Sequence, residues 1–505
     1  MSVSLVIASL GFPIWLRASH YINLLFIGLL MRSGIQILGA HPRLYWNNGC
    51  KPESNWLHLT RQKVPENKLW TSMDEEVPVT PLLALPGGDN LGIGRHWHFF
   101  SVIFWILNGL IYIVLLFTTG EWIRLIPTSW SIFPAAWHTF LTYITFHIPP
   151  ASDFHPYDPL QQLAYAAVVF LLGPFLIATG AAMSPAIEGR FPWYPKLFGS
   201  RQTARSLHFL GLVAFVLFTI MHTALVLIVH FQDNIRSIVL GNPHGNFTLA
   251  IIIAVIALLV VIAIYIWASW YSLRHKRRIQ HILGTIIDPT RDFLLQRVKP
   301  RQDYQPSEIT SYFWVNGRPP ESEEFQRLAE NNFADWRLEI SGLVVNPLSL
   351  SLEDLRKQPK QSQITMHNCI QGWTGIAEWG GVPLAELLKF SGTLPQAKYV
   401  VFTSYQSGRQ SYPKGPKETL DRPFYEVLSM EIAQHPQTIL AYEMNGKSLP
   451  LEHGAPLRLR AETELGFKMV KYLRSIELVE DYHTIWEGQG GFREDVQFYS
   501  MGAEI

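Results

Sequence analysis

The chain has 505 residues, a formal net charge of +1, a charged fraction of only 16% and an aromatic fraction of 13%. This length suits about three domains, and the near-zero net charge gives no reason to expect a nucleic-acid partner. With only two cysteines, Cys50 and Cys369, the chain has no disulfide framework, no Cys-rich zinc site and no iron–sulfur cluster of the usual four-Cys type.

Five long apolar segments in the first half predict transmembrane helices. Each has about 18 to 27 residues and almost no charge, as a helix that crosses a bilayer requires. Backbone polar groups in lipid must be satisfied within the segment, and Trp and Tyr cluster at several of the segment ends, as they do at membrane interfaces. The predicted spans are residues 21–38, 99–118, 160–183, 204–230 and 247–271.

The distribution of Lys and Arg predicts which side of the membrane faces the cytoplasm. The first loop, the third loop and the segment after the fifth span are rich in Lys and Arg, whereas the other side has little beyond Arg17, Arg124 and Arg236. The positive-inside rule therefore places the rich side, and with it the C-terminal half, in the cytoplasm. Residues 1–14 lack the basic region of a secretory signal peptide, and we expect a multi-pass protein of a bacterial inner membrane.

The fourth apolar segment carries His208 and His222, which are fourteen residues apart. In a helix this spacing is about 21 Å, and fourteen steps return to within about 40° of the starting direction. Both rings thus project from nearly one face, near opposite surfaces of a hydrocarbon core about 30 Å thick. Each ring could supply an axial ligand to a separate haem, although two polar residues packed inside a helix bundle could share this spacing.

Two further histidines lie at matching depths. His20 begins the first span, level with His222, and His98 begins the second span, level with His208. These depths predict two pairs, His20 with His222 and His98 with His208. An iron with two imidazole ligands is closed to small molecules, which suits electron transfer better than chemistry at the haem.

Two other polar residues lie in or beside these spans: His96, which could replace His98 as a ligand, and Arg32, whose charge needs a partner. His96 competes with His98, but residues two apart in a helix point about 200° away from each other, and His98 lies deeper in the span. Arg32 lies within the first span, where an unpaired charge is costly, and we expect a haem propionate as its partner.

The membrane half resembles a known group of cytochromes. The four histidines, with Gly94-Arg95-His96-Trp97-His98-Phe99-Phe100 and Arg32-Ser33-Gly34, resemble the di-haem cytochrome b subunits of nickel–iron hydrogenases and formate dehydrogenases and the cytochromes found with thiosulfate reductases. The resemblance covers roughly residues 15–275 and implies two b haems and exchange of electrons with membrane quinone. The long first loop, residues 39–95, departs from the shortest members, and the sequence assigns no role to it or to Cys50.

The second half predicts a linker followed by a strand-rich α+β domain. Residues 276–330 contain several X-Pro pairs typical of turns and extended chain. Asn445-Gly446 predicts a hairpin, and Ser351 with Asp354 predicts a capping box at a helix start. Predicted strands are residues 337–340, 363–367, 399–403, 438–443, 457–461 and 476–479, and predicted helices are 352–357, 383–388 and 430–434. The predicted architecture is an all-α membrane bundle (1–275), a linker (276–330), an α+β domain (331–485) and a C-terminal tail (486–505).

The distinctive stretch of this domain is Met366-His367-Asn368-Cys369-Ile370-Gln371-Gly372-Trp373, followed by Trp379-Gly380-Gly381-Val382-Pro383-Leu384. A single Cys that follows a strand is often only a small buried residue. Its thiolate is equally a soft ligand for a transition metal. These physical arguments alone leave the two interpretations open.

The order of the motifs resembles the sulfite oxidase family of molybdenum enzymes, especially the bacterial branch that includes the methionine sulfoxide reductase catalytic subunit. After the Cys and Trp motifs come His435-Pro436, Asn445-Gly446-Lys447-x-Leu449-Pro450, His453-Gly454-Ala455-Pro456-Leu457-Arg458-Leu459 and Gly466-Phe467-Lys468-x-x-Lys471. The resemblance covers roughly residues 331–480 and implies that Cys369 ligates molybdenum. It also implies that a molybdopterin cofactor is bound by Asn368, His453, Arg458, Lys468 and Lys471, since phosphates favour fixed cations.

The chain departs from this family at two places. Animal and plant sulfite oxidases carry an Arg pair shortly after the metal-binding Cys, whereas Ile370, Gln371, Gly372 and Trp373 follow here, which argues against a sulfite site built in the same way. Where the sulfoxide reductase has Trp-Lys-Tyr before Gly-Phe-Lys, this chain has Glu462-Thr463-Glu464-Leu465. The second difference predicts a reshaped pocket rim, so the same substrate cannot be assumed from the resemblance.

These observations together predict a fused membrane oxidoreductase. A cytochrome b with two b haems would exchange electrons with quinone, and a molybdenum–molybdopterin centre would transfer an oxygen atom to or from a small substrate such as a sulfoxide, an N-oxide or sulfite. Expected partners are membrane lipid, quinone and that substrate, with a homodimer as a further option. The alternatives are a catalytically silent binding or sensor module attached to the cytochrome, and a cytochrome that only passes electrons to a separate partner.

Overall fold

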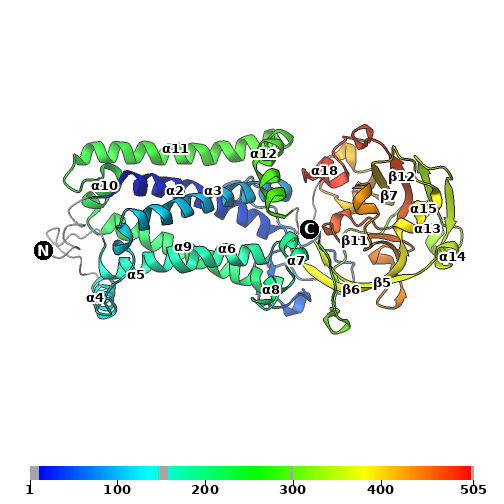
Figure 1. The fold of residues 1–505 in the computed structure, drawn as a ribbon, viewed down its shortest axis with the longest axis horizontal. Helices are drawn as coiled ribbons and strands as arrows, with labels where there is room; N and C mark the ends of the chain where they lie inside the picture. Colours follow the sequence, from blue (N-terminus) through cyan, green and yellow to red (C-terminus); the bar gives the residue numbers. More distant parts are fainter. Residues whose placement is uncertain (1–10, 146, 148–156, 296–299, 502–505) are drawn as a thin grey trace.

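The computed structural model describes residues 11–145, 147, 157–295 and 300–501. Long helices form a bundle at one end of the molecule, and a strand-rich domain forms the other end (Figure 1). Five helical stretches are long and apolar enough to cross a membrane, which confirms the predicted number and order of spans. They are α2 (Ile14–Gly39), α3 (Leu91–Thr118), α5 to α6 (Pro159–Ala167 and Gly173–Ala182, joined by a π-helical turn Val168–Leu172), α9 (Arg201–Ile228) and α11 (Phe247–Arg274).

Two of these helices begin earlier than predicted. Helix α2 starts at Ile14 rather than at residue 21, and α3 starts at Leu91 rather than at residue 99. The added turns are more polar, and their polar groups find partners within the protein; Arg17, for example, donates to the Val239 carbonyl at 2.6 Å. Hydropathy detects apolar runs and cannot detect a polar helical turn that is satisfied by packing.

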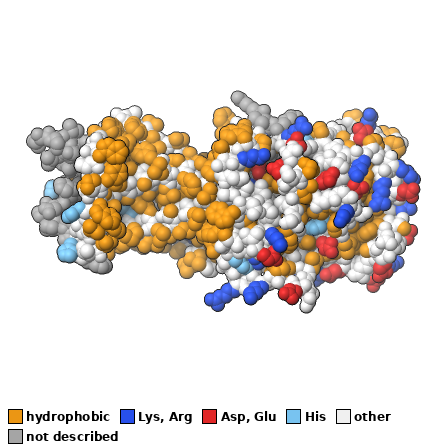
Figure 2. Space-filling model, turned by 90° about the horizontal axis from the view of Figure 1, so that it is seen from below, with side chains coloured by type: hydrophobic (Ala, Val, Ile, Leu, Met, Phe, Trp, Pro, Cys, Tyr) orange, Lys and Arg blue, Asp and Glu red, His pale blue; other side chains and the backbone are white. Residues whose placement is uncertain are grey.

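The face of the bundle seen in Figure 2 carries many apolar and few charged side chains, whereas Lys, Arg, Asp and Glu gather on the strand-rich end. Exposed side chains on α3 include Leu107, Leu110, Ile111 and Val114. An exposed apolar surface that surrounds a helix bundle is typical of contact with lipid. Shorter helices complete this half: α4 (Ile132–Ile144), α7 (Pro185–Arg190), α8 (Trp193–Lys196) and α10 (Phe231–Leu240).

The second half contains two five-stranded sheets, as the strand-rich prediction requires. One sheet has the order β4-β3-β12-β7-β8, formed by Leu348–Ser351, Arg337–Gly342, Leu473–Val479, Tyr399–Ser407 and Pro423–Ser429. The other has the order β10-β9-β6-β5, with β11 also paired to β9; these strands are Lys447–Ser448, Thr438–Met444, Thr374–Pro383, Gln361–Asn368 and Arg458–Ala461. The predicted Asn445-Gly446 hairpin joins β9 to β10, and Ser351 and Asp354 form the capping box of α14 (Leu352–Arg356).

Apolar side chains of both sheets share one core with short helices. Leu338, Ile340, Phe402, Leu440 and Ile476 are among its fully buried members. The short helices of this core are α15 (Leu384–Ser391) and α17 (Met430–Ala433), and the four-residue α16 (Gly408–Ser411) follows β7. This core fixes the positions of the strand ends that carry the candidate site.

Strands β4, β6 and β8 are absent from the sequence prediction. Strand β6 is rich in glycine, which lowers strand propensity. The structure explains Gly381, since a Cβ atom at this position would lie 2.0 Å from the Leu440 carbonyl oxygen of the paired strand β9. At the register shift between Gly380 and Gly381 the two backbones therefore come so close that only glycine fits at position 381.

The long first loop connects the bundle to the strand-rich domain. It contains the two-stranded hairpin β1 (Arg43–Leu44) and β2 (Leu57–His58). Trp314 donates to the Cys50 carbonyl at 2.8 Å, the Ser72 amide donates to the Val315 carbonyl at 2.8 Å, and Gln371 donates to the Ser72 carbonyl at 2.9 Å. The loop thus has a structural role, which is to pack the strand-rich domain against the membrane helices.

Two segments predicted as linker and tail are partly helical. Residues 276–295 form α12 (Lys276–Leu295), whose apolar side includes buried Ile279 and Leu283, and α13 spans Glu323–Glu330. The C-terminal segment contains α18 (Phe492–Gln497), and Gln280 of α12 donates to the Tyr499 carbonyl at 2.8 Å. Short apolar runs among Pro and charged residues predict extended chain, but packing against two domains at once stabilises a helix there.

A buried ion pair stabilises the first loop. Arg43 donates to the Glu75 carboxylate at 2.8 and 3.0 Å, and both side chains are buried. Arg43→Ala would leave the Glu75 charge buried without its partner, and we expect a loss of about 3–5 kcal/mol in unfolding free energy. Thermal unfolding of the purified chain measures this loss. Lys51→Ala, which removes an exposed ion pair with Glu53, is the matched control and should cost about 0–1 kcal/mol.

Candidate functional site

Four histidines of the membrane helices form two pairs. The rings of His20 on α2 and His222 on α9 have centroids 6.2 Å apart and an interplanar angle of 67°. His98 on α3 and His208 on α9 lie within electrostatic range of each other. Because α9 begins beside the strand-rich domain, the His98–His208 pair lies at that end of the bundle and the His20–His222 pair at the far end (Figure 1). The structure therefore brings together the residues that were predicted to pair.

Neighbouring hydroxyl groups fix the orientation of three of these rings. The bonds join Nδ1 to a hydroxyl oxygen: His98 to Ser33 at 3.0 Å, His208 to Thr179 at 3.1 Å and His222 to Tyr165 at 3.1 Å. A bond at Nδ1 leaves Nε2 as the atom that can ligate a metal, which is the usual arrangement of metal-binding histidines. The residues present fit axial ligation of a haem by each pair.

His96 and Arg32 lie in other surroundings. His96 bonds the Gly92 carbonyl and the Ser500 hydroxyl, so its ring is used in contacts with the C-terminal segment. Arg32 was predicted to bind a haem propionate, but its guanidinium donates to three carbonyl oxygens and to the Ser269 hydroxyl at 2.6–3.2 Å. The helix directs Arg32 toward α11 and the first loop, where protein oxygens replace the expected carboxylate.

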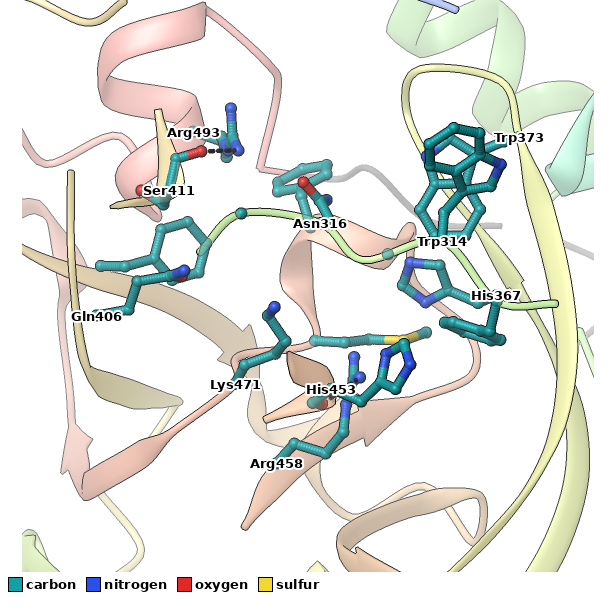
Figure 3. Close-up of a pocket in the computed structure, with 16 residues that line it drawn as sticks. Trp314, Asn316, His367, Trp373, Gln406, Ser411, His453, Arg458, Lys471 and Arg493 are labelled. Carbon is teal, nitrogen blue, oxygen red and sulfur yellow. Dashed lines mark hydrogen bonds between the residues drawn. The ribbon is translucent and has the colours of Figure 1, made fainter. Parts of the chain in front are cut away.

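The strand-rich domain contains a pocket lined by aromatic, cationic and amide side chains. His453, Arg458 and Lys471 approach it from one side, and Trp314, His367 and Trp373 from the other (Figure 3). Figure 3 also shows Arg493 bonded to the Ser411 carbonyl at 2.8 Å. The pocket thus combines a flat aromatic wall with fixed cations, as an aromatic cofactor that carries a phosphate requires.

Cys369 is buried just behind the wall of this pocket. It follows the last residue of β5, and a tight turn bonds its amide to the Trp373 carbonyl. Its Sγ atom lies 3.4 Å from Gln371 Oε1 and 4.0 Å from the Asn316 amide nitrogen. Burial raises the pKa of the thiol to about 12, so the thiol is neutral without a metal, and a bound cation would favour the thiolate.

Several buried polar atoms in the pocket lining, and one of Asn368 next to it, make no hydrogen bond within the described part of the chain. They are Asn368 Oδ1, Asn316 Oδ1, Arg458 Nε and Arg493 Nε. Buried polar groups in folded proteins are almost always bonded, so a group of unbonded donors and acceptors around one pocket indicates a polar ligand. Asn368 lies beside Cys369 and does not itself line the pocket.

His453, Arg458 and Lys471 pack together without a carboxylate partner among the described residues. Burial, with the neighbouring Lys471 and Arg458 charges, lowers the pKa of His453 to about 3. Burial, with the nearby Arg460, lowers the pKa of Arg458 to about 9, and burial also lowers the pKa of Lys471. Cations that repel one another in a pocket favour an anion, which agrees with the predicted phosphate.

The structure places Lys468 outside the pocket lining in which it was predicted to lie. Its ammonium is fully buried between Glu426, at 3.1 Å, and Glu494, and it also donates to the Val427 and Gly490 carbonyls. The two carboxylates raise the pKa of Lys468 above its usual value, against the opposing effect of burial. Lys468 therefore anchors α18 to β8. Its ammonium does not reach the pocket, because it is paired with these two carboxylates.

Sequence reasoning missed Arg493, Gln406 and Asn316, which also line the pocket. Arg493 belongs to the segment predicted as a tail, and Asn316 belongs to the predicted linker. Neither lies in a recognised motif, and only the packing of both segments against the domain brings them to the pocket. No local sequence pattern distinguishes Arg493 from a surface arginine of a tail.

The first turn of α9 contacts the turn that carries Cys369. Gln202 donates to the Gly372 carbonyl at 2.8 Å and to the Thr374 hydroxyl at 3.2 Å. A Cβ atom on Gly372 would lie 3.3 Å from Arg205 Nε, and Gly372 has a φ of +108°, so glycine is needed for this close contact. His208 follows Gln202 by six residues, which is about 9 Å along the helix.

Comparison with protein families matches both halves. Residues 11–241 match the family described as prokaryotic cytochrome b561, and residues 326–486 match the oxidoreductase molybdopterin binding domain. The chain is a fusion of a cytochrome b with a sulfite oxidase-like molybdopterin domain. These matches support haem b in the membrane bundle and molybdopterin in the strand-rich domain, and both sites have residues that fit these groups.

Curated proteins and solved structures show similarities that cover part of the fusion. YedZ1 of Azospira oryzae, which carries a provisional name as a protein-methionine-sulfoxide reductase subunit, is 34% identical over 37% of this chain and 64% of its own. The protein-methionine-sulfoxide reductase catalytic subunit MsrP of Campylobacter jejuni is 35% identical over 32% of this chain and 55% of its own. The matched region of this chain thus covers between about half and two thirds of the length of these relatives.

A solved structure, the sulfane dehydrogenase SoxCD from Paracoccus pantotrophus, is 25% identical over 32% of this chain and 40% of its own, with a TM-score of 0.26.

The buried triad of Lys468, Glu426 and Glu494 leads to a stability prediction for the molybdopterin domain. Lys468→Met would leave two buried carboxylates without a cation, and we expect a loss of about 3–5 kcal/mol in unfolding free energy, measured by thermal unfolding. The matched control is the triple variant Lys468→Met with Glu426→Gln and Glu494→Gln, which should recover part of the loss. Loss of molybdopterin from a Lys468→Met protein of unchanged stability would contradict the structural role.

Proposed function

We propose that this protein is a membrane-bound oxidoreductase that joins the quinone pool to a molybdenum centre, through two b haems held by the four histidines. Its molybdenum centre would transfer an oxygen atom to or from a small substrate, and the names of the relatives favour a sulfoxide. When bound, a b haem carries one electron, and a molybdenum–thiolate centre exchanges two electrons together with an oxygen atom.

The observation that carries this proposal is the position of both candidate sites on one element. Helix α9 holds His222 and His208 along its length and hydrogen-bonds the Cys369 turn with its first turn. A helix is rigid over this distance, so it keeps a constant separation between the membrane histidines and the Cys369 turn. A fixed and short separation is what electron exchange between two bound centres needs.

Different residues of the molybdopterin domain would bind the metal and the phosphate of the cofactor. Cys369 would supply a thiolate, while His453, Arg458 and Lys471 would hold the phosphate of the cofactor. Gln371 positions the turn, because its amide donates to the Ser72 carbonyl at 2.9 Å and to Glu76 at 2.8 Å while its oxygen accepts from Trp373.

The contacts of Glu462 and its neighbours do not support a reshaped pocket rim. The sequence predicted that residues 462–465 reshape the pocket rim. Glu462 is instead buried in a bidentate pair with Arg460, at 2.7 and 2.9 Å, and within the described residues no member of 462–465 lines the pocket. The residues that differ from the sulfoxide reductase therefore lie outside the pocket lining, which other residues form.

We place the molybdopterin domain on the cytoplasmic face of the inner membrane. Some cations of the first and third loops are used in internal contacts, as Arg43, Arg201 and Arg205 are. Exposed cations still gather at this end of the bundle: Lys51, Arg61, Lys63, Lys68, Lys196, Arg274 and Arg278. The positive-inside rule counts such exposed flanking cations.

Replacement of Cys369 by Ser tests the molybdenum site. A serine cannot provide the thiolate, so we expect Cys369→Ser to abolish reduction of methionine sulfoxide while the optical spectrum of the b haems is unchanged. Turnover is measured as reoxidation of quinol-reduced haem after addition of the sulfoxide. Cys50→Ser, which changes the other buried cysteine, is the control and should keep turnover. Full activity of Cys369→Ser would rule out the metal role.

Replacement of the histidines tests the haem sites separately. We expect His208→Ala and His222→Ala each to remove one of two haems, measured as haem per chain by the pyridine haemochrome assay, because each removes one axial ligand. His244→Ala, at an exposed loop position, should keep both haems. Two haems per chain in either ligand variant would contradict the assignment.

A further inference from the structure

Arg95 has a charge that the protein does not neutralise. It lies in the first turns of α3, and its guanidinium forms no hydrogen bond or ion pair with any residue that the structure describes; its neighbour is the ring of Phe99, 5.6 Å away. The guanidinium lies within electrostatic range of the Cys369 thiol and the Tyr499 hydroxyl. A partly buried guanidinium without a partner is costly, so this position favours an anion that the protein itself does not supply.

The hydroxyl of Tyr499 is a second unused donor at the same place. Tyr499 is buried, and its hydroxyl has no partner in the described chain. Gln280 donates to the Tyr499 backbone carbonyl at 2.8 Å, and the Tyr499 ring packs against Phe467 with centroids 5.1 Å apart. Arg95 and Tyr499 therefore present N–H and O–H donors to one small region, and an oxyanion can accept from both.

The geometry of α3 relates this region to the nearer histidine pair. Arg95 precedes His98 by three residues, so the two side chains lie on neighbouring parts of one helix face, about 4.5 Å apart along the axis. The His98 ring is held by Ser33, and Arg95 lies one turn nearer to the molybdopterin domain. A planar group bound at His98 would have its edge near Arg95.

Other cations near this region already have protein partners. Arg201 donates to the Met183 carbonyl at 2.8 Å and lies 3.9 Å from the Glu188 carboxylate. Arg205 donates to the Arg43 and His41 carbonyls at 2.8 and 2.6 Å. Arg32 has four protein acceptors. Arg95 differs from these three because its guanidinium donates to no residue in the described ranges.

We propose that Arg95 and Tyr499 form an oxyanion site for a propionate of the haem held by His98 and His208. This inference rests on the proposed function, since it needs a haem at that pair. In this proposal Arg95, and not Arg32, is the partner of the propionate. Arg95 then lies between the two redox sites and acts as a positioning residue. The phosphate of the molybdopterin cofactor has the same chemistry and approaches from the other side, so the experiment separates the two sources.

The experiment compares Arg95→Gln with the unchanged full-length protein, purified with its cofactors. We expect the midpoint potential of one b haem to fall while that of the other haem is unchanged, because a lost positive charge favours the oxidised haem. The propionate bending band in the resonance Raman spectrum should shift, while haem, molybdenum and pterin contents are unchanged. Arg95→Lys keeps the charge and should give a smaller fall in potential.

Two further variants complete the test. Tyr499→Phe removes one donor and no charge, so it should shift the same Raman band with little change of potential. Arg274→Gln makes the same substitution at an exposed position on α11 and should change neither readout, because solvent and salt screen that charge.

The outcomes that overturn the proposal are distinct. If Arg95→Gln lowers the pterin content and leaves both haem potentials and the Raman band unchanged, the anion is the cofactor phosphate. If no readout changes, Arg95 binds no anion. Absence of haem from the unchanged protein would instead contradict the proposed function itself.

Discussion

Helix α9 joins the two halves of the protein, because its first turn hydrogen-bonds the turn that carries Cys369. The bond from Gln202 to the Gly372 carbonyl fixes the strand-rich domain relative to the membrane bundle at the point where both candidate sites are closest. Gly372 packs closely on Arg205, and its positive φ of +108° strains any other residue at this position. The rest of the interface supports this contact: the first loop packs on one side of it, and α12 with the C-terminal segment packs on the other.

Buried charges in this protein fall into two groups. Arg43 with Glu75, Arg460 with Glu462, and Lys468 with its two carboxylates are neutralised within the chain, so they stabilise the fold. Among the described residues, Arg458 and Lys471 in the pocket have no carboxylate partner, and Arg95 contacts the Phe99 ring but forms no hydrogen bond or ion pair. Desolvation makes both arrangements expensive, but only the second can be relieved by a ligand. The presence or absence of a protein partner therefore distinguishes structural cations from binding cations better than the motif in which each cation occurs.

Lys468 and Lys471 illustrate this difference. Both belong to one sequence motif, three residues apart, and the resemblance assigned a cofactor role to both. A 3₁₀ turn at Gly466–Lys468 directs Lys468 into the domain, toward Glu426 and Glu494, while Lys471 lies along the pocket. A motif shows which residue type stands at a position. The direction of the backbone there decides whether its side chain points into the domain or into the pocket.

The sequence by itself determined the five membrane helices, the two histidine pairs and the position of Cys369 after a strand. These features depend on local patterns, namely apolar length, helical spacing and short motifs, and such patterns act on neighbouring residues. The sequence did not reveal the partners of Arg32 and Lys468, the role of the first loop, or the contribution of Arg493 and Tyr499 from a segment that reads as a tail. Only the tertiary structure decided these, because the partner of a buried charge can lie anywhere in the chain and is selected by packing rather than by proximity in sequence.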